Sequence, residues 1–251
     1  MGMGDWLMAT GEVKAMYEKT RQPVLVVDHT DRPQWSEIFR DNPKIIKRAR
    51  SGCGRVLSSS GRRPYIESKT QLRWNWRQYK PIPGELYFSS QEIEFAKQFA
   101  GAIMIEPQVK NIGHSNKAWF RDRWQSLVDR QAGRMVVQCS SNKDDFLTGV
   151  IPVVTPTFRH ACAVLAVCKA FVGTEGGLMH AAAATNVPAI ILWSEYIAPS
   201  ITGYSSHVNL RYANKMCGLR LDCPGCRESM NKITVNEVAE KLEAILKEPT
   251  P

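Results

Sequence analysis

One stretch, residues 171–193, most strongly limits how this chain can fold. Its sequence, "FVGTEGGLMHAAAATNVPAIILW", places two apolar segments around a turn with three glycines and a run of four alanines. Apolar segments separated by a glycine turn and a helix-forming run predict a strand, a tight loop, a helix and a second strand. The stretch therefore predicts one β-loop-α-β unit.

The glycine turn in this unit has the composition of an anion-binding loop. Gly173, Gly176 and Gly177 let the backbone approach a ligand closely, and free amides at the start of the next helix favour a phosphate or another anion. Many α/β proteins use such turns only for packing. Taken alone, the turn leaves both a ligand site and a purely structural role open.

Similar segments alternate over the second half of the chain. A Ser-x-x-Glu capping signal begins a predicted helix in "SSQEIEFAKQF". Strand-like "AIMIEP" and "RMVVQC" then alternate with helix-like "NKAWFRDRWQSLVDRQ", "TFRHACAVLAVCKA" and "TVNEVAEKLEAILKE". This alternation predicts an α/β fold, in which helices cover both faces of a parallel sheet.

A Pro-Ile-Pro-Gly sequence at residues 81–84 marks a change in composition and the expected hinge. Ahead of it the patterns predict a helix, a short strand and a second helix, at residues 7–19, 23–28 and 34–39. We therefore expect two domains, a basic acceptor-binding domain at residues 1–98 and a nucleotide-sugar-binding Rossmann-like domain at residues 99–251.

Composition limits the class of protein. The chain has 251 residues, 43% of them hydrophobic, which suffices for one large or two small domains with real cores. No apolar run reaches membrane-spanning length and no secretion signal is visible, so we expect a cytoplasmic protein without integral membrane contact. The seven cysteines are an odd number and are expected to be reduced thiols.

Positive charge is concentrated in one stretch of the chain. The net charge is +9, yet from Arg40 to Lys80 twelve basic residues oppose only Asp41 and Glu67. A local charge of +10 predicts that a polyanion binds to this region.

The order of these segments resembles the heptosyltransferase-type family of GT-B glycosyltransferases, related to the bacterial lipopolysaccharide heptosyltransferases. The stretch 171–193 is similar to the donor-binding signature of the family, and "SNKAWFRDRWQSLVD" to its lysine-then-tryptophan helix entry. "CPGCRESMNKITVNEV" is similar to its C-terminal end, and "GDWLMATGEVKAMYEK" to its Gly-Asp segment. The resemblance implies a GT-B-like fold of two Rossmann-like domains across a cleft, the N-terminal one reduced.

The resemblance also implies a donor site. Glu175 would contact the donor sugar or ribose, the amides of Gly176 and Gly177 would face the diphosphate, and His180 occupies a matching position. Lys117 would stabilise the charge that develops on the departing diphosphate. The alternatives are a packed histidine and a solvent-facing lysine. No Asp-x-Asp triplet occurs, so no metal is expected to be required for catalysis.

Asp5 carries the reaction in this interpretation. In the family the aspartate of the Gly-Asp segment removes a proton from the acceptor hydroxyl, which gives inversion in a single displacement. The alternative is an acid that only stabilises the start of a helix. Gly11 departs from the family pattern, in which proline is frequent at that position.

The segment "QLRWNWRQYK" is the candidate acceptor site. Arg73, Arg77 and Lys80 interleave with Trp74 and Trp76, a combination that grips phosphates while aromatic rings stack on bases. Spacing of two between the tryptophans equally fits a strand with one aromatic face in the core. With the local charge, we expect a nucleic acid as acceptor, favouring DNA with a hydroxylated modified base that is extruded from the duplex.

Two other functions remain open. A phosphorylated glycolipid core, the familiar acceptor of the family, is also anionic. In a different class, the chain would be a non-catalytic nucleic-acid-binding protein that keeps the fold. The base and the sugar of the nucleotide-sugar donor, hexose or pentose, do not follow from the sequence.

Three cysteines form a possible zinc site. Cys217, Cys223 and Cys226 are spaced C-x5-C-x2-C, and the Cys-Pro-Gly-Cys turn suits two thiolates on one structural zinc. A fourth ligand would come from Cys53 or His207 if the fold brings them near. The alternative is a set of reduced thiols packed at a loop.

Overall fold

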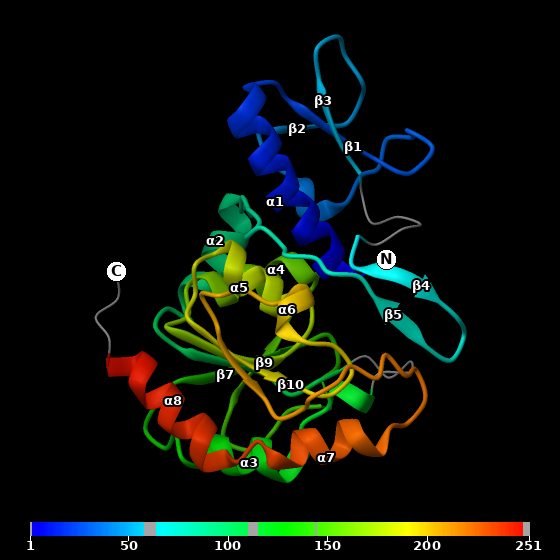
Figure 1. Ribbon diagram of the computed structural model, residues 1–251. Coiled ribbons are helices and arrows are strands. Elements are labelled where there is room, and N and C mark those ends of the chain that lie inside the picture. Colours follow the sequence, from blue (N-terminus) through cyan, green and yellow to red (C-terminus); the bar gives the residue numbers. More distant parts are fainter. Residues whose placement is uncertain (1, 58–63, 110–114, 144, 248–251) are drawn as a thin grey trace.

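The main body of the protein is a six-stranded parallel sheet with strand order β11-β10-β9-β6-β7-β8. The computed structural model describes residues 2–57, 64–109, 115–143 and 145–247 (Figure 1). The strands are β6 (Ile103–Glu106), β7 (Val136–Ser140), β8 (Ile151–Val154), β9 (Ala170–Thr174), β10 (Ala189–Trp193) and β11 (Val208–Arg211). The predicted α/β fold with a parallel sheet is confirmed.

Helices cover both faces of this sheet, as Figure 1 shows. They are α2 (Ser90–Lys97), α3 (Arg121–Asp129), α4 (Phe158–Ala166), α5 (Gly177–Ala184), α6 (Pro199–Thr202), α7 (Pro224–Lys232) and α8 (Val235–Lys247). Side chains alternate along the strands: Phe171 belongs to the hydrophobic cluster of α4 and α5, and Val172 to that of α3 and α8. The alternation of strand-like and helix-like segments thus gave the correct layers.

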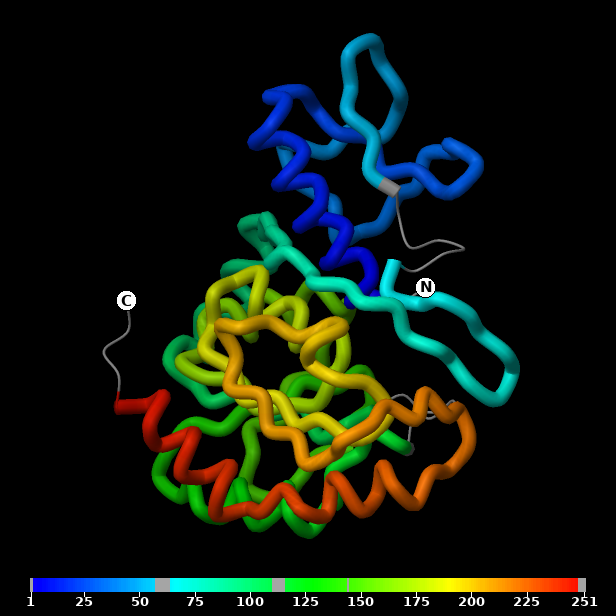
Figure 2. The backbone as a smooth tube through the Cα atoms, viewed as in Figure 1, coloured from blue at the N-terminus to red at the C-terminus, as the bar shows by residue number. Residues whose placement is uncertain are grey.

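A smaller lobe precedes the main body. It contains α1 (Met3–Thr20), a single turn of 3-10 helix η1 (Glu37–Phe39) and a parallel sheet of order β2-β1-β3. Its strands are β1 (Val24–Val27), β2 (Ile45–Ile46) and β3 (Gly54–Leu57), and an antiparallel hairpin follows, β4 (Ile66–Lys69) with β5 (Trp74–Trp76). Figure 2 shows the hairpin projecting beside the main body.

The sequence predictions for this lobe are partly right. The helix expected at residues 7–19 lies within α1, and the strand expected at 23–28 contains β1. The helix expected at 34–39 is only η1, because the backbone turns extended at Arg40 and left-handed at Asp41, whose φ is 64°. Strand β8 was missed because it lies at the sheet edge with three of its four residues exposed.

The segment at residues 81–84 packs directly against α1. A Cβ atom on Gly11 would lie 2.2 Å from the carbonyl oxygen of Ile82, and one on Gly84 would lie 2.5 Å from the carbonyl oxygen of Leu7. Only glycine leaves room for this crossing.

The division at residues 98 and 99 stays a prediction. None of the described helices is long and apolar enough to cross a membrane.

A buried arginine joins the small lobe to the main body. Arg159 on α4 is fully buried and donates to both carboxylate oxygens of Glu92, each at 2.7 Å. The same guanidinium donates to the carbonyl oxygens of Glu37 and Tyr87, at 3.2 and 2.5 Å. Burial alone would raise the pKa of Glu92, but hydrogen bonds from Arg159 and Ser89 lower it to about 2.

We expect Arg159→Met to lower the free energy of unfolding by about 3 kcal/mol, because Glu92 loses its buried partner and is left with the partly exposed Arg40. Adding Glu92→Gln should restore part of the loss. The native pKa of about 2 lies below the ordinary value of 4.5. The contribution is therefore complete above about pH 4.5 and lost as the pH falls toward 2.

Urea unfolding measures both effects, with Arg121→Met as control because its ion pair with Asp145 is exposed. If Arg159→Met and Arg121→Met lowered the free energy of unfolding equally, the role of Arg159 would be contradicted.

Candidate active site

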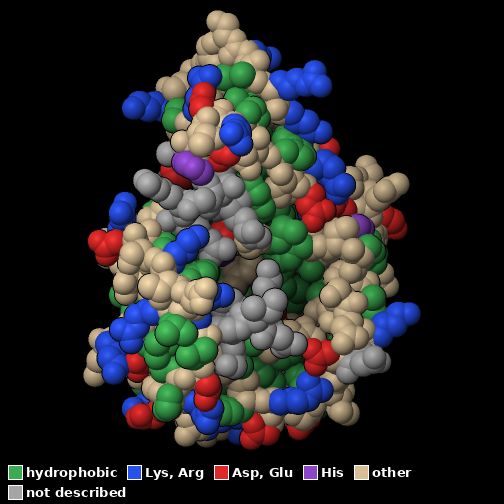
Figure 3. Space-filling model, turned by 90° about the vertical axis from the view of Figure 1, so that its right-hand side faces the viewer, with side chains coloured by type: hydrophobic (Ala, Val, Ile, Leu, Met, Phe, Trp, Pro, Cys, Tyr) green, Lys and Arg blue, Asp and Glu red, His purple; other side chains and the backbone are tan. Residues whose placement is uncertain are grey.

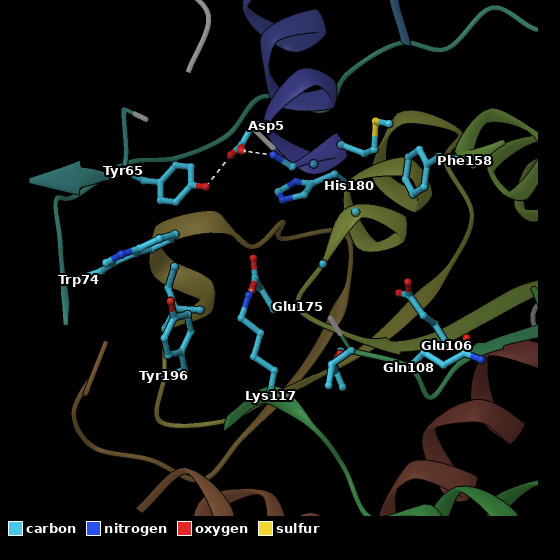
Figure 4. Close-up of a pocket in the computed structure, with 18 of the residues that line it drawn as sticks. Asp5, Tyr65, Trp74, Glu106, Gln108, Lys117, Phe158, Glu175, His180 and Tyr196 are labelled. Atoms are coloured by element: carbon cyan, nitrogen blue, oxygen red, sulfur yellow. Dashed lines mark hydrogen bonds and ion pairs between the residues drawn. The ribbon is translucent and has the colours of Figure 1, made fainter. Parts of the chain in front are cut away.

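A cavity of about 470 Å³ lies between the start of α1, the β4–β5 hairpin and the carboxyl ends of β6 and β9 (Figure 4). The face that carries the start of α1 and the hairpin is turned to the viewer in Figure 3, where hydrophobic side chains gather beside a hollow. In α/β proteins ligands bind at the carboxyl ends of the parallel strands. The cavity therefore has the position of a ligand site.

Two glycines let the first turns of α1 and α5 approach each other closely at this cavity. A Cβ atom on Gly4 would lie 2.6 Å from Cδ2 of His180. A Cβ atom on Gly177 would lie 3.7 Å from the backbone nitrogen of Gly4 and 2.9 Å from Cζ of Phe158. This close approach brings Asp5 to the same cavity as the glycine turn before α5.

Hydrogen bonds hold the carboxylate of Asp5 in place. Its Oδ2 accepts from the backbone N–H of Gly2 at 3.0 Å, and its Oδ1 accepts from the hydroxyl of Tyr65 at 2.6 Å. The helix-start role that the sequence left as an alternative is therefore present, and the same carboxylate lines the cavity. These bonds orient the carboxylate of Asp5.

The predicted donor-binding residues come together on the opposite wall. Lys117 ends the 3-10 turn η2 (Ser115–Lys117), and its Nζ forms an ion pair with Glu175, in the turn between β9 and α5. The same ammonium lies 5.1 Å from the ring centroid of Tyr196. Gly176 caps α5 and Gly177 begins it, and both line the cavity with the ion pair. Figure 4 shows Lys117 reaching Glu175 from below.

His180 lies on α5, three residues after Gly177, and is buried. Its Nδ1 shares a hydrogen bond of 2.8 Å with the hydroxyl of Tyr204. Burial lowers the pKa of His180 to about 4, so the imidazole is neutral near pH 7. The bond to Tyr204 fits the packing role that the sequence left open. Contact with a donor stays a prediction, because the side chain also lines the cavity.

The predicted acceptor segment separates into two groups. Trp74 and Trp76 of β5 line the cavity, and Trp76 donates from its Nε1 to the carbonyl oxygen of Tyr196 at 2.9 Å. The aromatic face expected for a strand is present: it borders the cavity, and Trp76 also packs against the hydrophobic core. The basic residues are exposed and do not line the cavity: Arg73, Arg77 and Lys80.

The predicted local charge of +10 is partly neutralised by acids from other segments. Arg40 pairs with Glu92, and Arg55 pairs with Asp31 at 3.0 Å. Lys44 forms a half-buried pair with Glu85, at 2.5 Å. The count over residues 40–80 missed these partners because they lie outside that range, so the positive surface is weaker than expected.

Several residues of the cavity escaped the sequence prediction, namely Tyr65, Glu106, Gln108, Phe158 and Tyr196. Glu106 had a signal, because it ends the strand-like segment "AIMIEP" and ligands bind at such ends. Tyr65 had none, since it meets Asp5 across 60 residues of sequence.

The three cysteines of the predicted metal site cluster outside this cavity. The Sγ atoms of Cys217, Cys223 and Cys226 all lie within 4.8 Å of one another. Cys217 and Cys226 share a hydrogen bond of 3.3 Å, which lowers the pKa of Cys217 to about 6 and raises that of Cys226. Neither Cys53 nor His207 joins this group in the part of the chain that the structure describes.

Comparisons with known proteins agree on one family. The model of glycosyltransferase family 9 (heptosyltransferase) matches residues 62–220. The fold is similar to glycosyl transferase family 9 from Veillonella parvula DSM 2008, at 13% identity and TM-score 0.67 over 99% of this chain and 95% of that one. E. coli ADP-heptose lps heptosyltransferase II is 23% identical, with TM-score 0.51 over 67% of this chain. The chain spans 55% of the length of that enzyme. A search of curated proteins found no match.

We expect Gly4→Ala to destabilise the protein, because the new methyl group would meet the ring of His180, which Tyr204 holds in place. Overpacking of this kind costs about 1–3 kcal/mol. That cost exceeds the gain of up to about 1 kcal/mol from the helix propensity of alanine. Urea unfolding measures the difference.

Gly2→Ala is the matched control, because its Cβ atom would lie 3.5 Å from Oδ2 of Asp5, an ordinary contact. If Gly4→Ala proved as stable as the native protein, the contact between α1 and α5 would be looser than described.

Proposed function

Because this chain belongs to glycosyltransferase family 9, we propose that it transfers a sugar from a nucleotide-sugar donor to a hydroxyl of an anionic acceptor, with inversion and without a metal at the reaction centre. Its fold is GT-B-like with a reduced N-terminal lobe. One observation supports the proposal most: Asp5 and the turn with Glu175 and Gly176 line the same cavity.

The donor diphosphate would lie between Lys117 and the start of α5. Amide groups at a helix N-terminus favour anions, and the ammonium of Lys117 would stabilise the charge that forms as the sugar leaves. Glu175, already paired with Lys117, is placed to accept hydrogen bonds from the sugar or ribose.

Asp5 would act as the general base. Its carboxylate would remove the proton of the acceptor hydroxyl as that oxygen attacks the anomeric carbon. Tyr65 orients the carboxylate through its 2.6 Å hydrogen bond. Attack and departure on opposite faces of the sugar give inversion.

For the acceptor we favour a phosphorylated saccharide such as a glycolipid core. The family description names heptosyltransferases, and the E. coli relative is described as a lipopolysaccharide enzyme. Aromatic side chains line the mouth of the cavity, while exposed Arg73 and Arg77 lie on the same hairpin for phosphate groups.

DNA carrying a hydroxylated base is the weaker candidate. No comparison supports it, and Trp76 is packed between Tyr65 and Tyr196, with ring centroids 6.2 and 5.3 Å away. A ring held in this way offers little surface for an unpaired base. The non-catalytic alternative leaves the joint placement of Asp5, Lys117 and Glu175 unexplained.

We expect Asp5→Asn to lower kcat by a factor of about 10²–10⁴, because the amide cannot take the proton. Affinity for a nucleoside diphosphate should stay unchanged, since Asp5 faces the acceptor.

Lys117→Ala should show the opposite pattern, with weakened diphosphate binding. Mass spectrometry of product and calorimetry of diphosphate binding measure the two effects.

Glu12→Gln is the matched control, because Glu12 lies on the same helix and hydrogen-bonds Tyr79 outside the cavity. The assay offers phosphorylated saccharides and hydroxymethylated DNA with a panel of nucleotide sugars. Native activity in Asp5→Asn would remove Asp5 as base, and a sugar-sized mass gain on DNA alone would reverse the choice of acceptor.

We also propose that Cys217, Cys223 and Cys226 bind one structural zinc ion. Zinc–sulfur bonds of about 2.3 Å in a tetrahedron separate the sulfur atoms by about 3.8 Å. The described thiols, within 4.8 Å of one another, fit that spacing with small movements. Water would fill the fourth position, because no other described His, Cys, Asp or Glu side chain joins the group.

Purified protein should contain about one zinc ion per chain, held by the three thiolates. Elemental analysis of Cys226→Ser should show its loss, and the variant should unfold at lower temperature. Cys53→Ser is the control, since Cys53 is partly exposed in the small lobe. The zinc site would be contradicted if purified native protein contained no zinc and its unfolding temperature did not change on addition of zinc or of a chelator.

A further inference from the structure

Among the described residues of the cavity wall, Glu106 is the acid that neither the sequence interpretation nor the proposed reaction uses. It is the last residue of β6, and Gly173 of β9 lies opposite it in the sheet. Figure 4 shows its carboxyl group pointing from the end of the strand into the cavity. A Cβ atom on Gly176 would lie 3.9 Å from Oε2 of Glu106, which puts this oxygen beside the cap of α5.

The Oε2 atom is buried and has no hydrogen-bond partner among the described residues. A buried polar oxygen without a partner is unfavourable, and native proteins keep one where a ligand or a reaction needs it. The position of Oε2, at the cap of the helix that would hold a diphosphate, suggests that the missing partner belongs to the ligand.

The surroundings of Glu106 favour its neutral form. Burial and then the negative charge of Glu175 raise its pKa to about 8, against the opposite effect of Lys117. Behind it, Cys139 of β7 and Cys162 of α4 are thiols whose pKa burial raises, so they add no charge. Near pH 7 the carboxyl group therefore carries its proton and is a hydrogen-bond donor.

We propose that Glu106 binds the donor as a neutral carboxylic acid, which donates a hydrogen bond from Oε2 to an oxygen of the diphosphate. The inference rests on the proposed function, because it takes the cavity as the nucleotide-sugar site. An ionised carboxylate at this position would repel the diphosphate, whereas the neutral acid adds a donor next to the α5 amides and Lys117. The ion pair with Glu175 weakens the attraction of Lys117 for a phosphate. A neutral carboxylic acid forms no such ion pair, so its hydrogen bond to the diphosphate would not be weakened in this way.

This role predicts that the affinity for a diphosphate depends on one proton. The protonated fraction of a group with a pKa near 8 falls about ten-fold between pH 7 and pH 9, so affinity should fall by a similar factor. Binding at pH 9 should also take up protons, approaching about one per nucleotide, because only the protonated form binds well. Glu106→Gln keeps a neutral donor at every pH, and it should lose both effects.

Calorimetric titration with ADP at pH 7 and pH 9, without added metal, tests the proposal. Each titration is run in two buffers of different ionisation enthalpy, which gives the number of protons taken up. Native protein should bind about ten-fold less tightly at pH 9, whereas Glu106→Gln should match native affinity at pH 7 and hold it at pH 9. Glu94→Gln, an exposed change on α2, is the control and should behave as the native protein.

Equal pH dependence and equal proton uptake in the native protein and in Glu106→Gln would overturn the proposal. Weak binding of Glu106→Gln at pH 7, with no proton uptake by native protein, would also overturn it, because it would make Glu106 a charged acceptor. Neither result touches the proposed glycosyl transfer. Failure of native protein to bind ADP, UDP, GDP or CDP at either pH would instead reject the donor site and Glu106 with it.

Discussion

The contact between the first turns of α1 and α5 determines the geometry of the whole cavity. A side chain at Gly4 would clash with His180 of α5, and one at Gly177 would clash with Phe158 of α4. Helix α1 also packs against the small sheet, so the same contact sets the position of the small lobe. Asp5 reaches the cavity because it is one residue beyond Gly4, on the turn that makes this contact.

Among the described residues that line the cavity, carboxyl groups outnumber ammonium groups, and their charges are balanced in different ways. Asp5 is held by Tyr65 and the backbone of Gly2, Glu175 is paired with Lys117, and Glu106 is kept neutral by burial. A dianionic diphosphate can approach only if these negative charges are compensated. The amides at the start of α5 supply part of that compensation without any titratable group.

Local periodicity was sufficient for the α/β layers, and the resemblance of several segments to the heptosyltransferase-type family was sufficient for the family and the GT-B-like fold. It also named residues that the fold brings to one cavity, Asp5 and Lys117 among them, although their roles stay predictions. Pairs formed across long stretches of chain had no local signal, as with Tyr65 and Asp5 or Arg159 and Glu92. For the same reason the charge between Arg40 and Lys80 was overestimated, since its partners lie elsewhere in the sequence.

The wall of the cavity that the β4–β5 hairpin forms depends on the C-terminal half of the chain as well. The backbone N–H of Trp74 donates to the carbonyl oxygen of Gly218 at 2.9 Å, and a Cβ atom on Gly218 would lie 1.9 Å from the carbonyl oxygen of Trp74. Gly218 follows Cys217, and Asn116 bonds both the N–H of Cys223 and the carbonyl oxygen of Leu219. The thiol cluster is thus linked to the hairpin on one side and to the residue before Lys117 on the other. A change at the cysteines would therefore alter both the wall with the hairpin and the wall with Lys117, because one loop contacts both.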